Sequence, residues 1–255
     1  MTGTSESPRR LDVALAAAGL ARSRSHAREL IRAGYVTVGG QVERRPAAPV
    51  TGVEHLQVAG DAMADLVSRA GGKLRGALAD LEVPVPARCA DIGSSTGGFT
   101  QVLLSEGAER VFAVDVGTDQ LHPDLRADPR VSVREQTNAR TLTVADLDGQ
   151  PVDLVVADVS FISLTLLLEP ILGILTDSGA ALLMVKPQFE VGRQRVGPGG
   201  VVRDPELQRE AVAQVQQHAE ALGWSCRQVA PSRVPGPAGN LEFFCHFVGP
   251  RAAAQ

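Results

Sequence analysis

Short apolar runs alternate with amphipathic runs over the second, longer part of the chain. Runs rich in apolar or β-branched residues predict strands at 89–93, 110–117, 130–136, 151–160 and 181–187. Apolar residues at helical spacing predict helices at 97–107, 163–175 and 204–223, and two more strand-like runs follow at 225–231 and 242–248. Strands that alternate with helices predict an α/β domain with a mostly parallel sheet.

The beginning of the chain has a different pattern. Helical spacing predicts helices at 9–20 and 23–34, and the alternation of 35–43 around a Gly-Gly pair predicts a β-hairpin. Arg24, Arg28 and Arg32 are four residues apart and therefore share one face of the second helix. Such a stripe is typical either of a solvated helix face or of a surface that binds an anionic partner.

Charge is distributed unevenly between these two parts. The chain of 255 residues has a net charge of −4. Residues 1–60 contain eight arginines and five acidic residues, a net charge of +3, whereas residues 61–255 have a net charge of −7. This asymmetry indicates a basic binding module joined to an acidic domain.

Several classes of protein are disfavoured by composition. No apolar run approaches the ~20 residues that a membrane helix needs, and the first residues, MTGTSESPRR, lack the apolar segment of a secretion signal. We therefore expect a cytoplasmic protein with no membrane partner. Its three cysteines, Cys89, Cys226 and Cys245, follow no metal-ligand spacing, so we interpret them as small buried apolar residues and expect no metal site.

A glycine-rich turn, DIGSSTGGFT at 91–100, follows a predicted strand and begins a predicted helix. Gly93, Gly97 and Gly98 allow the backbone to bend sharply and to approach a ligand. Asp115 ends the next predicted strand, where an acid suits a ribose hydroxyl of an adenosine-containing cofactor. The alternative is that the glycines only let the helix pack closely on the strand.

The spacing of these glycines bears on the choice of cofactor. A dinucleotide site has the pattern G-x-G-x-x-G, in which the second glycine lets the backbone approach a pyrophosphate. Here the glycines follow Gly93-Ser-Ser-Thr-Gly97, without a second glycine two residues after the first. S-adenosylmethionine therefore fits the turn better than NAD.

Lysine is almost absent from the chain. Of 25 basic side chains only Lys73 and Lys186 are lysines, and Lys186 follows the apolar run LLMV directly. A single lysine at a strand end is most simply a side chain that reaches out to solvent. Arginine stays protonated at any working pH, whereas a buried lysine can release its proton.

Seven motifs together resemble the TlyA family of S-adenosylmethionine-dependent ribosomal RNA 2′-O-methyltransferases, historically labelled haemolysins. They are DIGSSTGGFT, DVGTDQL, TNAR, DLVVADVSFISL, VKPQFEVG, VGPGGVVRDP and PGPAGNLEFF, and the resemblance runs from Arg10 to about Val248. It implies a small α+β S4 RNA-binding domain at 9–60, a linker at 61–70, and a Rossmann-like class I methyltransferase domain of the FtsJ-like type at 71–250. It also implies ribosomal RNA, within ribosomal subunits, as the partner.

The resemblance further implies a catalytic Lys-Asp-Lys-Glu tetrad. Motif by motif, its members are Lys73 in SRAGGKL, Asp158 in VADVSF, Lys186 in MVKPQFE and Glu242 in GNLEFF. Both lysines of the chain are thus members. A ribose 2′-hydroxyl is a poor nucleophile, so a base must take its proton, and Lys186 is the better candidate because it follows a buried strand. Lys73 and Asp158 would hold the hydroxyl and the base in line, and Glu242 would balance the charges.

Other residues carry over to the cofactor and to the RNA. The resemblance places Asp91, Gly93, Ser94, Thr96, Gly97 and Gly98 at the cofactor turn. It implies that Asp115 contacts the ribose hydroxyls of the cofactor and that Asn138 in QTNAR contacts its adenine. The alternative for Asn138 is an ordinary turn residue. Arg10, Arg24, Arg28 and Arg32 are the candidates for contacts with the RNA backbone.

Three other functions compete with RNA methylation. A membrane-lytic protein would need a spanning or membrane-binding helix, and the amphipathic run 204–223 is acidic and rich in glutamine. A ribosome-binding module without catalysis would leave the intact tetrad without a use. An O-methyltransferase for small molecules would leave the basic N-terminal module unexplained.

Overall fold

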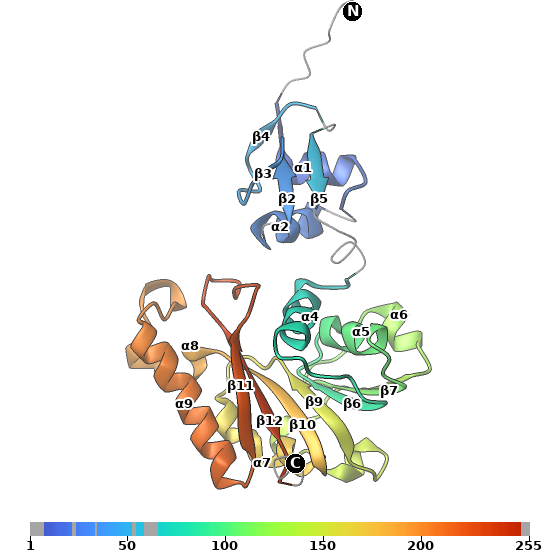
Figure 1. The fold of residues 1–255 in the computed structure, drawn as a ribbon. Coiled ribbons are helices and arrows are strands. Elements are labelled where there is room, and N and C mark those ends of the chain that lie inside the picture. Colours follow the sequence, from blue (N-terminus) through green and yellow to red (C-terminus); the bar gives the residue numbers. More distant parts are fainter. Residues whose placement is uncertain (1–7, 22–23, 34, 53–54, 59–65, 251–255) are drawn as a thin grey trace, which may run out of the picture. The chain divides into compact units, whose positions relative to one another are not determined.

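The computed structural model describes residues 8–21, 24–33, 35–52, 55–58 and 66–250 (Figure 1). The chain divides into two compact units at the bond between Arg69 and Ala70. Half of the predicted linker 61–70 lies outside the described residues, and Arg69 already begins a helix. The predicted domain boundaries therefore stay a prediction.

In its described residues the first unit contains two helices and short strands, as its sequence pattern predicts. Its elements are β1 (Arg9–Arg10), α1 (Leu11–Ala17), α2 (Arg24–Ala33), β2 (Val36–Val38), β3 (Gln41–Val42), β4 (Pro49–Val50) and β5 (Leu56–Val58). The predicted hairpin is confirmed, since β2 pairs with β3 in antiparallel fashion across Gly39 and Gly40, both of which have positive φ. Leu11, Leu15 and Leu30 are fully buried between the helices and the strands.

The second unit is built on a sheet of seven strands in the order β11-β12-β10-β9-β6-β7-β8. Its strands are β6 (Arg88–Ile92), β7 (Arg110–Val114), β8 (Val131–Arg134), β9 (Val152–Ala157), β10 (Leu175–Val185), β11 (Ser225–Pro231) and β12 (Phe243–Val248). The strands β6 to β10 pair in parallel, whereas β12 runs antiparallel to both of its neighbours. The prediction of a mostly parallel α/β sheet is therefore confirmed.

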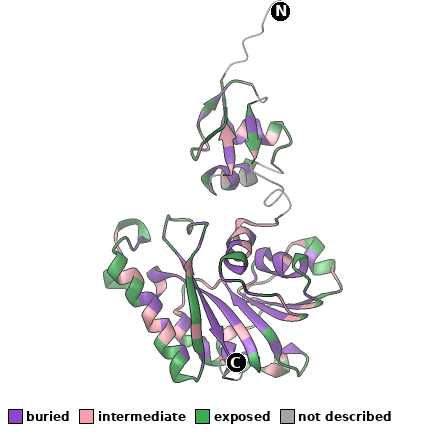
Figure 2. Ribbon diagram, viewed as in Figure 1, coloured by how far each residue is buried: buried purple, intermediate pink, exposed green. Residues whose placement is uncertain are grey.

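Helices cover both faces of this sheet, which explains why its central strands β6 and β9 are buried almost throughout. The helices are α4 (Arg69–Asp80), α5 (Gly98–Ser105), α6 (Pro123–Ala127), α7 (Leu168–Gly173), α8 (Pro187–Glu190) and α9 (Pro205–Ala221). Leu183 and Val185 of β10 belong to the core that packs against α7 and α9, while Leu182 and Met184 alternate to the opposite face and are also buried. Figure 2 shows the central strands as a buried layer.

The order of the strands determines where a site can form. From β6 the chain moves through β7 to β8 on one side, and then returns to β9 on the other side of β6. Ligands of such sheets bind at this switch point, beyond the carboxyl ends of the strands. The loops after β6, β7, β9 and β10 therefore meet at one edge, and the antiparallel β12 begins there.

Two local features differ from the sequence expectations. The pattern at 163–175 predicts one helix, but the chain forms a 3₁₀ turn at Leu164–Leu166 and a short helix, α7, that ends at Gly173. Leu175 already pairs with Val152 of β9, so sheet pairing overrides the apolar helical pattern there. The five-residue α6 is too short to leave a periodic signal. No helix in the described part of the chain is both long and apolar enough to span a membrane.

Candidate functional site

The glycine-rich turn after β6 requires glycine at two positions. Gly93 has a φ of +82°, and a Cβ there would lie 2.9 Å from the backbone oxygen of Asp158. Gly97 has a φ of +93°, and a Cβ there would collide with the side chains of Leu125 and Leu121. The turn can therefore lie tightly against the end of β9 only without side chains at these positions.

Asp91 lies beneath the turn and fastens the start of α5. One of its carboxylate oxygens accepts hydrogen bonds from the backbone N–H of Thr100 at 2.9 Å and from its hydroxyl at 2.7 Å. The other oxygen, Oδ1, is buried and has no hydrogen-bond partner. Complete burial raises the pKa of Asp91 to about 7, against the lowering effect of the Thr100 hydrogen bonds.

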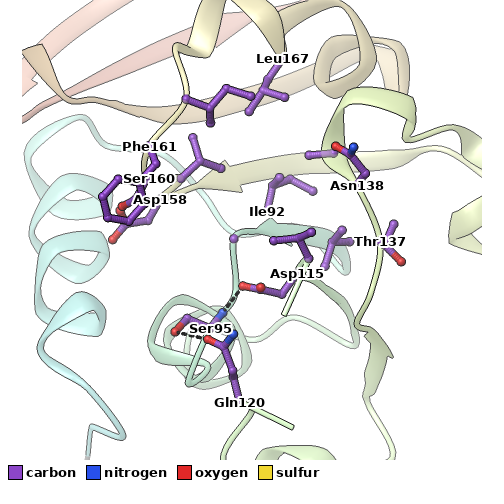
Figure 3. Close-up of a pocket in the computed structure, with 16 residues that line it drawn as sticks. Ile92, Ser95, Asp115, Gln120, Thr137, Asn138, Asp158, Ser160, Phe161 and Leu167 are labelled. Atoms are coloured by element: carbon purple, nitrogen blue, oxygen red, sulfur yellow. Dashed lines mark hydrogen bonds between the residues drawn. The ribbon is translucent and has the colours of Figure 1, made fainter. Parts of the chain in front are cut away.

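A cavity of about 520 Å³ opens beyond the carboxyl ends of β6, β7 and β9 (Figure 3). Its lining residues come from the turn and from the loops after these strands: Ile92, Gly93, Ser95, Val114, Asp115, Val116, Gln120, Thr137, Asn138, Ala139, Asp158, Val159, Ser160, Phe161, Ile162 and Leu167. Of the predicted cofactor residues, Gly93, Asp115 and Asn138 line this cavity. The others support the turn around it without lining it: Asp91, Ser94, Thr96, Gly97 and Gly98.

Asp115 and Asn138 are held in place by backbone groups. The carboxylate of Asp115 accepts hydrogen bonds from the N–H groups of Ser95 at 2.8 Å and Gly117 at 2.7 Å, one on each oxygen. Each oxygen keeps a lone pair for another donor. The side-chain oxygen of Asn138 accepts from the N–H of Arg140 at 3.0 Å. Asn138 therefore stabilises a turn and also lines the cavity. Its role as a turn residue does not exclude a contact with the adenine of a cofactor.

The lining suits a nucleoside-containing cofactor such as S-adenosylmethionine. The cavity volume lies within the range of small-molecule sites. Apolar side chains of Ile92, Val116 and Leu167 are available for a base, and the carboxylate of Asp115 can accept from ribose hydroxyls. Figure 3 shows Asn138 and Asp158 on opposite sides of the cavity, so a ligand that fills it reaches Asp158.

The four residues of the predicted tetrad lie together at this edge of the sheet. Lys186 follows β10, and its Nζ lies 2.5 Å from Oδ1 of Asp158, which follows β9. The other oxygen of Asp158 is 3.9 Å from Nζ of Lys73 on α4. Lys73 in turn donates to Glu242, just before β12, at 2.6 Å. The four side chains thus form one chain of alternating charge.

All four members of this chain are shielded from water. The side chains of Lys73, Glu242 and Lys186 are 5%, 1% and 8% exposed, and that of Asp158, which borders the cavity, is 15% exposed. Two ammonium groups and two carboxylates balance to zero net charge. Loss of one member would leave an uncompensated buried charge, which is far more costly than loss of an exposed ion pair.

Residues outside the predicted tetrad position it. Ser160 accepts a hydrogen bond from Nζ of Lys186 at 2.8 Å. A Cβ on Gly236 would lie 2.6 Å from Oε1 of Glu242, so this glycine leaves room for the carboxylate. Asn240 accepts from the N–H of Val202 and donates to the carbonyl of Gly200, and so ties the Glu242 turn to the glycine-rich loop at 192–206. Sequence reasoning named the motifs PGPAGNLE and VADVSF but did not assign roles to these three residues.

Two phenylalanines border the tetrad. Phe161 is 92% exposed and has a φ of +66°, which is unusual for a residue with a side chain. Its ring centroid lies 5.5 Å from that of Phe189, whose ring lies 6.0 Å from Nζ of Lys186. Phe161 and Phe189 also line a second cavity, of about 530 Å³, which extends to Arg193 and the glycine-rich loop. The rings of Phe161 and Phe189 therefore line open space next to Lys186.

In the first unit, three of the four predicted arginines gather on one buried carboxylate. Asp12 is fully buried, and it accepts hydrogen bonds from Arg10 at 3.0 Å, Arg24 at 3.1 Å and Arg28 at 2.8 Å. The guanidinium groups, that of Arg10 above all, hold the pKa of Asp12 well below its usual range. Arg32 is exposed and is not part of this cluster. The cluster has a net charge of +2 and presents partly exposed guanidinium groups.

Comparison with known proteins agrees with both units. The family model of the FtsJ-like methyltransferases matches residues 66–248, and that of the S4 domain matches residues 9–55. The 16S/23S rRNA (cytidine-2′-O)-methyltransferase TlyA of Mycobacterium tuberculosis is 49% identical over 92% of this chain and 88% of that protein.

Solved structures give the same match. A Streptococcus thermophilus protein named as a hemolysin has a TM-score of 0.73 and 37% identity, over 95% of this chain and 89% of that chain. A Lactococcus lactis protein of the same description has a TM-score of 0.69 and 44% identity, over 72% of this chain and 88% of that chain.

The buried pair of Lys73 and Glu242 gives a prediction for stability. Replacement of Glu242 by Gln should lower the free energy of unfolding of the second unit by about 3 kcal/mol, because Lys73 keeps its charge and loses its nearest carboxylate. Trp224 is the only tryptophan of the chain and lies buried in this unit, so its fluorescence reports the transition during urea unfolding. The matched control is Glu206→Gln, which breaks an exposed pair with Arg209 and should change the value by less than about 0.5 kcal/mol. If both variants lower the free energy of unfolding equally, the Lys73–Glu242 pair does not have the stabilising role expected of a buried pair.

The pKa of Asp91 gives a prediction for pH dependence. The unfolded carboxyl ionises near pH 4, whereas in the folded protein its pKa is about 7. Between these values the folded state binds more protons, so this group lowers stability as pH rises, by up to about 1.4 kcal/mol per pH unit. Asp91→Asn keeps an acceptor for Thr100 and removes the charge. The unfolding free energy of Asp91→Asn should therefore rise relative to that of the wild type between pH 4.5 and pH 7. If the difference between the two unfolding free energies stays constant over this range, Asp91 ionises normally in the folded protein.

Proposed function

Because this chain belongs to the TlyA family of FtsJ-like methyltransferases, we propose that it methylates ribose 2′-hydroxyls of ribosomal RNA and uses S-adenosylmethionine as methyl donor. The observation that carries the proposal is the buried chain of Lys186, Asp158, Lys73 and Glu242, one member of which lines the cavity proposed for the cofactor. The related M. tuberculosis enzyme is named for cytidine, and we propose cytidine as the target here too.

In this proposal the cofactor cavity is held by the turn after β6 and by the ends of β7 and β9. Asp115 accepts from the ribose hydroxyls of the cofactor, and Asn138 contacts its adenine. Bound S-adenosylmethionine supplies a methyl group on a positively charged sulfonium, which is electrophilic. The carboxylate of Asp158 lies at the border of the cavity, so the group to be methylated is presented there.

Lys186 is the proposed base. In its unprotonated form, Nζ would take the proton of the 2′-hydroxyl, and the bound cofactor would supply the methyl group that the ribose oxygen accepts in place of that proton. Asp158 holds Nζ from one side at 2.5 Å and Ser160 holds it from another at 2.8 Å, which fixes the direction of its lone pair. Once Lys186 has gained the proton, the carboxylate of Asp158 stabilises the ammonium that results. General-base help of this kind contributes roughly 10²–10⁴ in rate.

Lys73 and Glu242 act on Asp158 in this scheme. The Lys73 ammonium lies 3.9 Å from Asp158 and 2.6 Å from Glu242, so it holds Asp158 in place without leaving the site with excess charge. Because reactants held in line need no further loss of orientational freedom, this positioning is expected to supply much of the remaining acceleration.

The S4 unit is the proposed RNA anchor. Arg10, Arg24 and Arg28 share the buried carboxylate of Asp12, which fixes their guanidinium groups before RNA arrives. Arginine suits phosphate because its planar group donates two parallel hydrogen bonds. Aromatic residues make up only 4% of the chain, so charge and RNA shape, rather than base stacking, would supply most of the affinity.

The role of Lys186 is tested by two variants assayed together. With tritiated S-adenosylmethionine and ribosomal subunits that lack the modification, Lys186→Ala should lower the rate of methyl transfer by about 10²–10⁴ while calorimetry still detects cofactor binding. Lys186→Arg should be equally inactive, because arginine keeps the positive charge but does not release its proton. An active Arg variant would mean that Lys186 contributes only charge. No transfer by the wild type to either subunit, with cofactor binding intact, would overturn the proposed substrate.

The arginine cluster is tested by the salt dependence of RNA binding. Removal of two phosphate contacts in the double variant Arg24→Ala/Arg28→Ala should reduce the slope of log affinity against log salt by about 1.5. The control is Arg45→Ala in the same unit, since Arg45 is 78% exposed and pairs with Glu43 instead of Asp12. An unchanged slope in the double variant would show that this face does not bind RNA.

A further inference from the structure

Two of the three cysteines lie on neighbouring strands of the sheet. Cys226 is on the edge strand β11, opposite Phe247 of β12, and Cys245 is two residues from Phe247 on the same strand. Side chains two residues apart on a strand point to the same face. Cys226 and Cys245 therefore face the same side of the sheet, where both pack against the core beneath α9. Each of the two thiols alters the pKa of the other, and neither is in a disulfide.

The environments of the two thiols differ. Cys245 is fully buried, and its pKa is raised well above the usual value because it donates its hydrogen to Cys226 and because it is buried. Cys226 is only partly buried. The hydrogen bond from Cys245 lowers the pKa of Cys226 to about 7, despite partial burial and the nearby negative charge of Glu220 on α9. Near neutral pH about half of the Cys226 side chains are then in the thiolate form, which is the nucleophile in thiol chemistry.

We propose that Cys226 and Cys245 form an oxidisable dithiol, in which Cys226 is attacked by a hydroperoxide and Cys245 closes a disulfide between β11 and β12. This site is separate from the methyl-transfer chemistry and does not depend on the proposed function. It changes the sequence interpretation of the cysteines, which treated all three as inert apolar residues.

The two steps balance with a hydroperoxide as the oxidant. First, the Cys226 thiolate attacks the outer peroxide oxygen; an S–O bond forms, the O–O bond breaks, and the leaving alkoxide or hydroxide takes a proton from water. Next, the sulfur of Cys245 attacks the sulfenic acid; the S–S bond forms, the S–O bond breaks, and the hydroxide that leaves takes the Cys245 proton to become water. Two electrons pass from the thiols to the peroxide.

Closure of this bond requires a small movement of the edge strand, because Cys245 lies opposite Val229 and Cys226 lies opposite Phe247. A disulfide needs sulfur atoms about 2 Å apart, with close Cβ atoms. The pairing register shifts between Cys226 and Gln228, so the regular ladder is interrupted beside Cys226. Because β11 is the edge strand, with only β12 as its partner in the sheet, it can move more easily than an inner strand.

The third cysteine is a built-in control. Cys89 is fully buried in β6, its thiol donates to the carbonyl of Pro86, and burial raises its pKa to about 12. It should therefore be oxidised and alkylated at least about tenfold more slowly than Cys226. Arg227 and Arg233 lie between the paired cysteines in the sequence, so trypsin separates them into different peptides that only a disulfide would join.

The test is a disulfide map of the full chain. Reduced protein is treated with hydrogen peroxide, alkylated, digested with trypsin without reductant and analysed by mass spectrometry. The expected result is a cross-linked pair of peptides that contain Cys226 and Cys245, with Cys89 alkylated. Free thiols on both residues, irreversible oxidation of Cys226 without a cross-link, or preferential oxidation of Cys89 would each overturn the proposal.

Variants assign the order of the steps. In Cys245→Ala the sulfenic acid on Cys226 should persist and be captured by a 1,3-dione reagent, whereas Cys89→Ala should form the disulfide as the wild type does. Capture of no sulfenic acid in a folded Cys245→Ala variant, with folding checked by Trp224 fluorescence, would overturn the assignment of Cys226 as the attacked residue. If Cys245→Ala does not fold, the map of the wild type decides by itself.

Discussion

A single carboxylate between two ammonium groups organises the candidate active site. Asp158 lies 2.5 Å from Lys186 and 3.9 Å from Lys73, in surroundings that exclude most water. Two buried cations so close together would repel each other strongly without it, and Glu242 supplies the second negative charge. This constraint explains the backbone around the site: Gly93 and Gly236 are glycines because any side chain would press on Asp158 or Glu242. The sheet edge that borders the cavity proposed for the cofactor therefore also fixes these charges.

The two units use the same electrostatic device with different cations. In the S4 unit a buried carboxylate, Asp12, gathers three arginines, and in the methyltransferase unit buried carboxylates hold the two lysines. Arginine keeps its proton and is suited to permanent contacts with phosphate, whereas lysine can release a proton in a buried site. In a chain with 23 arginines and two lysines, the proposed function thus assigns RNA attraction to arginine and proton transfer to lysine.

Much of this organisation can be predicted from the sequence, because strands buried on both faces and a glycine-rich turn leave strong patterns. The motifs also named four residues that the fold brings together, although only the fold shows that Asp158 lies between both lysines, and their catalytic role stays a prediction. Other features leave no periodic signal. Asp12 is an acidic residue between a leucine and a valine, and its burial depends on packing from α2 and β4. Phe161 looks like a core residue in DLVVADVSFISL, yet it is 92% exposed because the backbone turns there with positive φ. Asp91 is the first residue of the DIGSSTGGFT motif, but it lies beneath the cavity and does not line it.

The most direct test of this interpretation is the chemical position of the transferred methyl group. Ribosomal RNA labelled by the wild-type protein would be digested to nucleosides, and the labelled nucleoside would be identified by mass spectrometry. A tetrad that deprotonates a ribose hydroxyl predicts a methyl group on the 2′-oxygen, in 2′-O-methylcytidine, with the adjacent phosphodiester resistant to alkali. Label on a base carbon or nitrogen, with the phosphodiester still cleaved by alkali, would contradict the assigned role of Lys186 and Asp158.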